Sequence, residues 1–286
     1  MRIIRSVIFT LLSSIPILIS TPSYSMPQHA EGLDETLITI ALDEGRFQTG
    51  VLSRKKESRN ETVLSVLLPG YPAVVRPVVT NGAMTKSKLT GNFLIRARRH
   101  LVDDNIVALV VDCHSKSGPI CSPDYQTSEG RQRDVAALIQ ETVTRLPSIQ
   151  EIWLIGTSMG TLSSAFMPFY AKTYYAGAIH TATLTETFDR YPQLHKFSYK
   201  SQGIPQFFIH HENDPCRLTQ YSKIQNIAQH NNIPLITARG GGNFKGDACK
   251  AFTEHGFRGI EKQVMKEIKF ILLNKKPSGK TITEEY

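Results

Sequence analysis

Short apolar runs alternate along this chain with segments of helical spacing, and this alternation constrains the fold more than any other feature. The runs predicted to be buried strands are residues 63–68, 106–111, 152–157, 176–180, 206–210 and 235–237. The segments predicted to be helices are residues 86–101, 134–146, 160–170 and 221–228, together with a last helix that carries Ile260, Val264, Ile268, Ile271 and Leu272 on one face. Apolar strands of about five residues that are separated by helices form a parallel sheet covered on both faces. The sequence therefore predicts an α/β fold with a mostly parallel sheet.

The two ends of the chain differ from this pattern. Residues 36–42 and 47–52 are expected to pair as strands around Asp43-Glu44-Gly45, and residues 274–286 are polar and expected to fray. No Gly/Ser-rich or Pro-rich linker divides the chain. We therefore predict one domain over residues 26–286 with a short polar C-terminal tail.

A serine stands between two glycines where the apolar run 152–157 ends, in Gly156-Thr157-Ser158-Met159-Gly160. The Gly-x-Ser-x-Gly pattern between a strand and a helix is typical of a nucleophile elbow, in which a strained turn lifts the serine hydroxyl off the sheet edge. Side chains two residues before and after the serine would collide there, so both positions favour glycine. The alternative is a strand-to-helix corner whose glycines serve packing alone.

A serine hydroxyl needs a base to become a nucleophile, and in the elbow fold the chain order is serine, acid, histidine. Of the nine histidines, only His230 and His255 follow the best acid. We favour His255, in a loop just before the last helix, because His230 falls near a helix end. Asp214 is the expected acid, because it follows a strand and precedes Pro215; Glu212 is its rival in the same turn.

An oxyanion hole needs backbone N–H donors directed at the developing charge. We expect these from Met159, at the start of the helix after the serine, and from Tyr71, beside Gly70 in the turn after residues 63–68. The alternative is that Gly70 belongs to an ordinary turn.

The N-terminus predicts export. Arg2 and Arg5 precede an apolar run over residues 7–19, and Pro22-Ser23-Tyr24-Ser25 follows. This pattern indicates a signal peptide over residues 1–25, and therefore a periplasmic or secreted protein. The alternative, an uncleaved anchor, is disfavoured because the run is short for a span of about 20 residues, so we expect no stable membrane span after cleavage.

Four cysteines in an exported chain indicate disulfides, with three possible pairings. If Asp214 bonds to His255, their loops are neighbours, and a Cys216–Cys249 bridge would clamp one to the other. Cys113 and Cys121 would then close a small loop. No CxxC pair or HExxH helix is present, so the sequence predicts no metal site. The net charge of +8 comes from scattered basic residues without a stripe or interleaved aromatics, which disfavours nucleic-acid binding.

Taken together, the Gly156–Gly160 motif, the Asp214 turn and the Glu254-His255-Gly256 loop, in this order, resemble the α/β-hydrolase superfamily over residues 64–273. The resemblance implies an eight-stranded, mostly parallel sheet with helices on both faces and a serine hydrolase mechanism without metal or cofactor. The chain departs from many lipases in two ways. The oxyanion turn reads Pro69-Gly70-Tyr71 instead of His-Gly-Gly-Gly, and the insertion between residues 180 and 206 is too short for a large lid domain.

The resulting hypothesis is an exported serine hydrolase of carboxylic esters or thioesters that acts on a small-molecule substrate. Within the insertion, Phe188, Tyr191, Phe197 and Tyr199 would wall the acyl pocket or else serve ordinary packing. Two further functions stay open. One is a peptidase or amidase with the same triad, and the other is a catalytically silent binding protein on a hydrolase scaffold. The sequence leaves the oligomeric state open.

Overall fold

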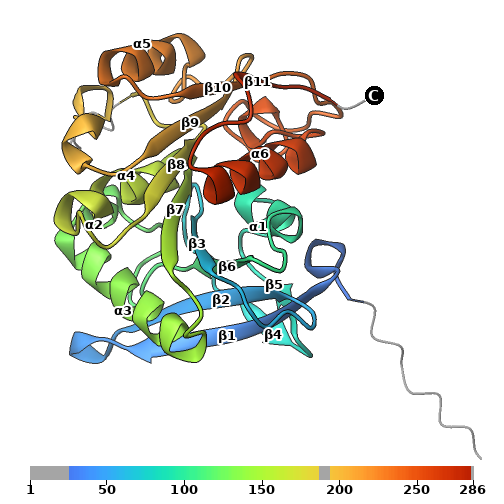
Figure 1. The fold of residues 1–286 in the computed structure, drawn as a ribbon, viewed down its shortest axis with the longest axis vertical. Coiled ribbons are helices and arrows are strands. Elements are labelled where there is room, and N and C mark those ends of the chain that lie inside the picture. Colours follow the sequence, from blue (N-terminus) through green and yellow to red (C-terminus); the bar gives the residue numbers. More distant parts are fainter. Residues whose placement is uncertain (1–25, 187–193, 285–286) are drawn as a thin grey trace, which may run out of the picture.

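The fold is a twisted sheet between two layers of helices, shown in Figure 1 for a computed structural model of the chain. The structure describes residues 26–186 and 194–284. The predicted signal peptide over residues 1–25 lies outside these residues. Among those described, no helix combines the length and the apolar character needed to cross a membrane.

Nine strands form the main sheet in the described part of the chain, in the order β1-β2-β6-β3-β7-β8-β9-β10-β11. Their bounds are Leu33–Ala41 (β1), Phe47–Lys55 (β2), Val63–Leu68 (β3), Ile106–Val111 (β6), Glu151–Thr157 (β7), Gly177–Thr181 (β8), Gln206–His211 (β9), Leu235–Ala238 (β10) and Thr281–Ile282 (β11). β1 with β2 and β2 with β6 pair antiparallel, whereas the remaining pairs are parallel. The mostly parallel sheet predicted from the apolar runs is confirmed.

The helices cover both faces of this sheet, as predicted. α1 (Phe93–Ala97) and α6 (Glu261–Asn274) lie on one face, and α2 (Pro123–Gln126), α3 (Glu129–Arg145) and α4 (Thr161–Tyr170) lie on the other (Figure 1). α5 (Tyr221–Asn231) packs with α4 against Phe208 of β9. β3 is buried along its whole length because Leu67 faces the α1–α6 layer while Leu64 and Val66 face α3.

The helix predicted over residues 86–101 is present but shorter, as α1 (Phe93–Ala97) followed by a 3-10 turn over Arg98–His100. Before it, β4 (Val78–Thr80) and β5 (Ala83–Lys86) form a separate two-stranded sheet. The side chain of Asn92 accepts a hydrogen bond from the Leu94 N–H and starts the helix there. Phe93, Leu94 and Ile95 are consecutive apolar residues, and all three are buried in this short helix.

The frayed C-terminal tail and the count of eight strands are wrong, for one reason. The edge of β10 presents unpaired backbone groups, and residues of the tail pair with them. The Thr237 N–H donates to the Lys280 carbonyl and the Arg239 N–H to the Ile282 carbonyl. The tail thereby adds β11 as a ninth strand, with Ile282 buried.

Candidate active site

Ser158 lies at the carboxyl end of the central strand β7, where the chain turns into α4. Its φ is +51°, a left-handed conformation that a non-glycine residue adopts only when the surrounding structure holds it there. A short 3-10 turn over Ser158–Gly160 leads directly into α4. The strand, the strained residue and the helix together have the geometry of a nucleophile elbow.

The two flanking glycines are required by space. A Cβ on Gly160 would lie 2.0 Å from the Leu68 carbonyl oxygen, and one on Gly156 would lie 2.3 Å from the Ser164 hydroxyl. The absence of side chains therefore lets the start of α4 approach the end of β3. This close approach is compatible with both interpretations of the glycines, a tightly packed corner and a nucleophile elbow.

The turn after β3 passes beside Ser158. A Cβ on Gly70 would lie 3.0 Å from the Ser158 Cβ, so Gly70 marks a close approach of two backbones. The N–H groups of Tyr71 and Met159, the predicted oxyanion donors, have no hydrogen-bond acceptor among the residues that the structure describes. Both residues border the same pocket as Ser158. The Tyr71 side chain is 60% exposed, so only the backbone of this residue is placed for such a role.

Asp214 and His255 meet behind this pocket. The Nδ1 of His255 lies 3.0 Å and 3.3 Å from the two carboxylate oxygens of Asp214, whose side chain is fully buried. The Cys216 N–H and the Thr219 hydroxyl also donate to this carboxylate, at 2.9 Å and 2.8 Å. Three donors therefore hold the carboxylate in place, and the carboxylate orients the imidazole.

The electrostatics favour an ionised Asp214. Burial acts to raise the pKa of its carboxyl group, but the hydrogen bond and the charge of His255, together with His210 and the Cys216 N–H, outweigh burial, and the pKa lies below its ordinary value. The carboxylate is thus charged at neutral pH and can stabilise an imidazolium.

The rival residues are placed elsewhere. Glu212 forms a surface ion pair with Arg239 at 2.8 Å. His230 belongs to α5 and borders a different pocket, beside Lys223 and Thr185.

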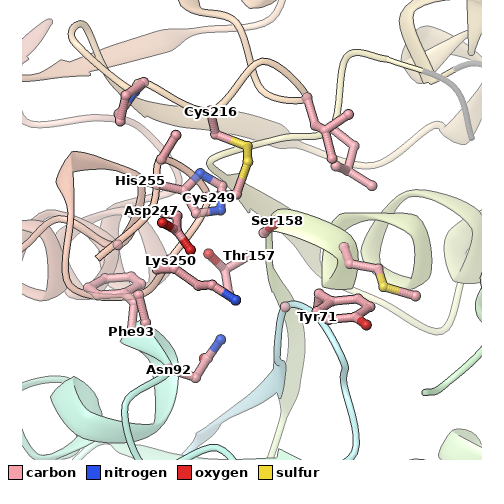
Figure 2. Close-up of a pocket in the computed structure, with 18 of the residues that line it drawn as sticks. Tyr71, Asn92, Phe93, Thr157, Ser158, Cys216, Asp247, Cys249, Lys250 and His255 are labelled. Atoms are coloured by element: carbon pink, nitrogen blue, oxygen red, sulfur yellow. A yellow bond between two sulfur atoms is a disulfide. The ribbon is translucent and has the colours of Figure 1, made fainter. Parts of the chain in front are cut away.

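Ser158 and His255 line one pocket of about 680 Å³ (Figure 2). No hydrogen bond joins the Ser158 hydroxyl to His255 among the described residues. The structure therefore brings Ser158 and His255 to one cavity but shows no hydrogen bond between them. Hydrogen bonds between catalytic groups are often long in the absence of substrate.

Both predicted disulfides are present in the structure. Cys216–Cys249 joins the loop after β9 to the loop before α6, and it borders the pocket next to His255 (Figure 2). Cys113–Cys121 closes a loop after β6, and the Cys121 N–H donates to the Pro72 carbonyl in the turn that contains Tyr71. Each bridge braces a loop that carries predicted site residues.

Two aromatic residues of the insertion, Phe197 and Tyr199, lie among the described residues, and both pack against other side chains. Tyr199 is buried against Phe208 and His180, and Phe197 packs on Phe166. Neither borders the pocket, so ordinary packing accounts for both. Phe188 and Tyr191 lie outside the described residues.

The structure adds site residues that the sequence analysis missed. The Thr219 hydroxyl lies 2.8 Å from a carboxylate oxygen of Asp214 and 3.2 Å from the Nδ1 of His255. Asn92, Asp247 and Lys250 border the pocket from loops far from Ser158 in the sequence. None belongs to a recognisable motif, and only the folded loops bring these residues to the serine.

No family model matches this chain, and neither does any curated protein. Solved structures do match. Est1E from Butyrivibrio proteoclasticus is 12% identical with a TM-score of 0.57, covering 84% of this chain and 98% of that one. A cold-adapted esterase from an Arctic intertidal metagenomic library is 13% identical with a TM-score of 0.53, covering 86% and 95%. The Pyrococcus furiosus esterase Pf2001 is 15% identical with a TM-score of 0.50, covering 75% and 86%. At such identities the likeness establishes a shared fold.

Proposed function

We propose that this chain, which has the α/β-hydrolase fold of the esterases it resembles, is a serine hydrolase of carboxylic esters or thioesters. One observation carries the proposal. The Nδ1 of His255 contacts the buried carboxylate of Asp214, and His255 lines the same pocket as Ser158, whose φ is +51°. A plain packing corner needs neither the strained serine nor a buried carboxylate behind a histidine.

In the acylation step, the Nε2 of His255 accepts the proton of the Ser158 hydroxyl as the oxygen attacks the ester carbonyl. Asp214 holds the ring in the tautomer that leaves Nε2 free and stabilises the imidazolium that forms. The N–H groups of Tyr71 and Met159 bind the developing oxyanion. His255 then returns the proton to the leaving alcohol or thiol.

In the deacylation step, His255 removes a proton from water as the water oxygen attacks the acyl-enzyme carbonyl. The bond between the Ser158 oxygen and the acyl group then breaks, His255 returns the proton to that oxygen, and the carboxylic acid leaves. The leaving group has vacated the pocket by this stage, so water reaches the carbonyl through its place. No metal or cofactor enters this scheme.

The preference for esters has two supports. The similar structures are named esterases, and one of them has ferulic acid bound, which makes a feruloyl ester a sensible test substrate. The segment between β8 and β9 spans residues 182–205, which is short for a lid domain and suits small or projecting substrates.

The same proposal includes export. Residues 1–25 are the proposed signal peptide, and residues 26–286 are the proposed mature domain in the periplasm or the medium. Two disulfides persist in oxidising compartments and are rare in reducing ones, which supports this placement.

The test is labelling of the oxidised mature protein with a fluorophosphonate probe, followed by peptide mass spectrometry. We expect the label on Ser158, and none in Ser158→Ala. Ser201→Ala is the matched control, because Ser201 is exposed and bonds only locally. His255→Gln is expected to suppress labelling, whereas His230→Gln retains it.

Hydrolysis assays then separate the reaction classes. A panel of acetyl, butyryl and feruloyl esters and thioesters is compared with peptide amides of the same acyl groups. Labelling with turnover of peptides alone would favour the peptidase. No labelling of folded protein would overturn the hydrolase proposal in favour of a binding protein.

A further inference from the structure

The pocket beside Ser158 has an apolar body with a few charged groups at its border. Tyr71, Phe93, Leu184 and Leu218 supply apolar surface, whereas Lys250, Arg217 and Asp247 supply charge. A cavity of about 680 Å³ is the size that encloses a small organic molecule. Such a cavity suits a small molecule with an apolar body, which under the proposed function is an ester, and the charged groups at the border select what else it carries.

Lys250 is a cation at the border of this pocket, and the residue is exposed to solvent. Figure 2 shows its side chain reaching into the cavity, with the ammonium end directed toward the side bordered by Asn92. In the described part of the chain, no carboxylate lies within ion-pair distance of this ammonium. Asp247 also borders the pocket. It contacts Lys250 through its backbone carbonyl, which accepts a hydrogen bond from the Lys250 N–H at 2.8 Å.

Asn92 adds a donor to the same space. Its Oδ1 is engaged by the Leu94 N–H, at 3.1 Å, so the orientation of the amide is set by the start of α1. The Nδ2 lies 3.5 Å from the place of a Cβ on Gly70, next to Ser158, and it has no acceptor among the described residues. An amide donor and an ammonium therefore face one region of the pocket, and no described residue accepts a hydrogen bond from either.

The backbone that carries these two donors is held by the fold. Lys250 directly follows Cys249, which the disulfide ties to Cys216. Asn92 caps a helix. Donors on anchored backbone lose less freedom when they bind a ligand, which favours recognition over solvation.

We propose that Lys250 and Asn92 form a subsite for an anionic group, and that the substrate of the proposed hydrolase is an ester bearing a carboxylate. This specificity rests on the proposed function. The carboxylate accepts from the ammonium and from the amide while Ser158 attacks the ester carbonyl. Asp247 limits the attraction, because its own charge repels the same group.

The test uses two pairs of rigid esters that differ only in a carboxylate or a carboxamide. In 4-acetoxybenzoate and 4-acetoxybenzamide the group is on the leaving side. In monomethyl terephthalate and methyl 4-carbamoylbenzoate it is on the acyl side. We expect the wild-type protein to prefer the carboxylate in one of these pairs by about tenfold in kcat/KM, the effect of one charge-assisted hydrogen bond at a partly solvated site.

Variants move this preference in opposite directions. Lys250→Met abolishes it and Lys250→Arg retains it. Asp247→Asn increases it, and Asn92→Asp, which keeps the cap acceptor for Leu94, reverses it. Lys245→Met is the matched control, since this lysine lies near the same loop without bordering the pocket. If the preference of the wild-type protein for the carboxylate is electrostatic, added salt weakens this preference.

Binding to the Ser158→Ala protein separates this proposal from the hydrolase proposal. Calorimetric titration with the same four esters requires no turnover. If the wild-type protein hydrolyses none of them while Ser158→Ala binds the carboxylates more tightly, the subsite stands and the hydrolase proposal fails for these esters. Equal binding and equal turnover of carboxylate and carboxamide in both pairs would overturn the subsite.

Discussion

At the scale of single residues, the site depends on how closely the Ser158 turn approaches the end of β3. Gly160 has a φ of −64°, which any residue can adopt, so its identity is a matter of space alone. A Cβ there would lie 2.0 Å from the Leu68 carbonyl oxygen and 2.6 Å from that of Pro69. The carbonyls belong to the backbone that leads into the proposed oxyanion donor Tyr71.

Gly160→Ala is therefore expected to displace this turn. We predict a loss of about 1–3 kcal/mol in the free energy of unfolding, as for other overpacked sites. Because a shift near 1 Å misplaces the oxyanion donors, we predict a loss of about 100-fold in kcat/KM for an ester. Thermal unfolding and ester assays measure the two effects.

Gly242→Ala is the control, because a Cβ on Gly242 has nothing within 4 Å. It is expected to retain the activity and the stability of the wild-type protein. An ester kcat/KM for Gly160→Ala equal to that of the wild-type protein would contradict the account of the turn.

At the scale of elements, the acid and the base are carried by two loops, one after β9 and one before α6. The Cys216–Cys249 bridge links them across 33 residues, two residues from Asp214 and six from His255. The hydrogen bond between Asp214 and His255 thus has a covalent brace beside it. The Cys113–Cys121 bridge spans only 8 residues and braces the turn near Pro72.

The double variant Cys216→Ser, Cys249→Ser is expected to lose about 4 kcal/mol of stability by the loop-entropy estimate, and the double variant Cys113→Ser, Cys121→Ser about 2.5 kcal/mol. The first should also lose about tenfold in kcat/KM well below its melting temperature, since small misplacements of catalytic groups are costly. Urea unfolding and ester kinetics at 15–20 °C, roughly the range of maximal stability, test both statements. Full activity of the first variant would show that the loops hold their geometry without the bridge.

At the scale of the whole molecule, two histidines on strands of the sheet, His180 on β8 and His210 on β9, are buried without charge. Burial lowers the pKa of both His180 and His210 to about 4, against an ordinary value of 6.5. The neighbours of His180, the Ser164 hydroxyl at 2.8 Å and the Gln206 amide oxygen at 2.9 Å, suit a neutral ring that accepts from one and donates to the other.

Such groups make stability depend on pH. Between pH 6.5 and 4 the unfolded chain binds these protons while the folded protein does not, so stability is fully present above pH 6.5 and declines as the pH falls toward 4. We predict a loss of up to about 3 kcal/mol for each histidine across this window. Urea unfolding at several pH values between 4 and 7.5 measures it.

The pair of substitutions His180→Gln and His210→Gln should flatten this dependence, whatever it does to stability at neutral pH. His230→Gln should leave the slope as it is, because the α5 histidine is exposed. An unchanged slope in the buried-histidine variant would show that other groups cause the acid sensitivity.

The sheet itself was predictable from local patterns. β3 and β6 occupy the predicted residues 63–68 and 106–111, because a strand buried on both faces appears in the sequence as an uninterrupted apolar run. The positions of Ser158, Asp214 and His255 relative to strands and helices were also predictable, since each follows or precedes an element with a clear pattern. The roles of these three residues stay proposals until they are tested.

Other features depend on contacts that a local pattern does not contain. α1 begins at Phe93 because Asn92 caps it, and the tail becomes β11 because the edge of β10 accepts it. Thr219 reaches Asp214 and His255, and Asn92 and Lys250 reach the pocket, through loops that meet only in three dimensions.

The division has a physical cause. Periodic burial and the glycines around Ser158 reflect constraints between neighbours in the chain, so the amino-acid sequence by itself determined the layered sheet and where its sharp turn falls. Cavity shape, unpaired donors and strand edges depend on which distant segments approach one another. The tertiary structure alone decided that an ammonium and an amide face the space beside the serine.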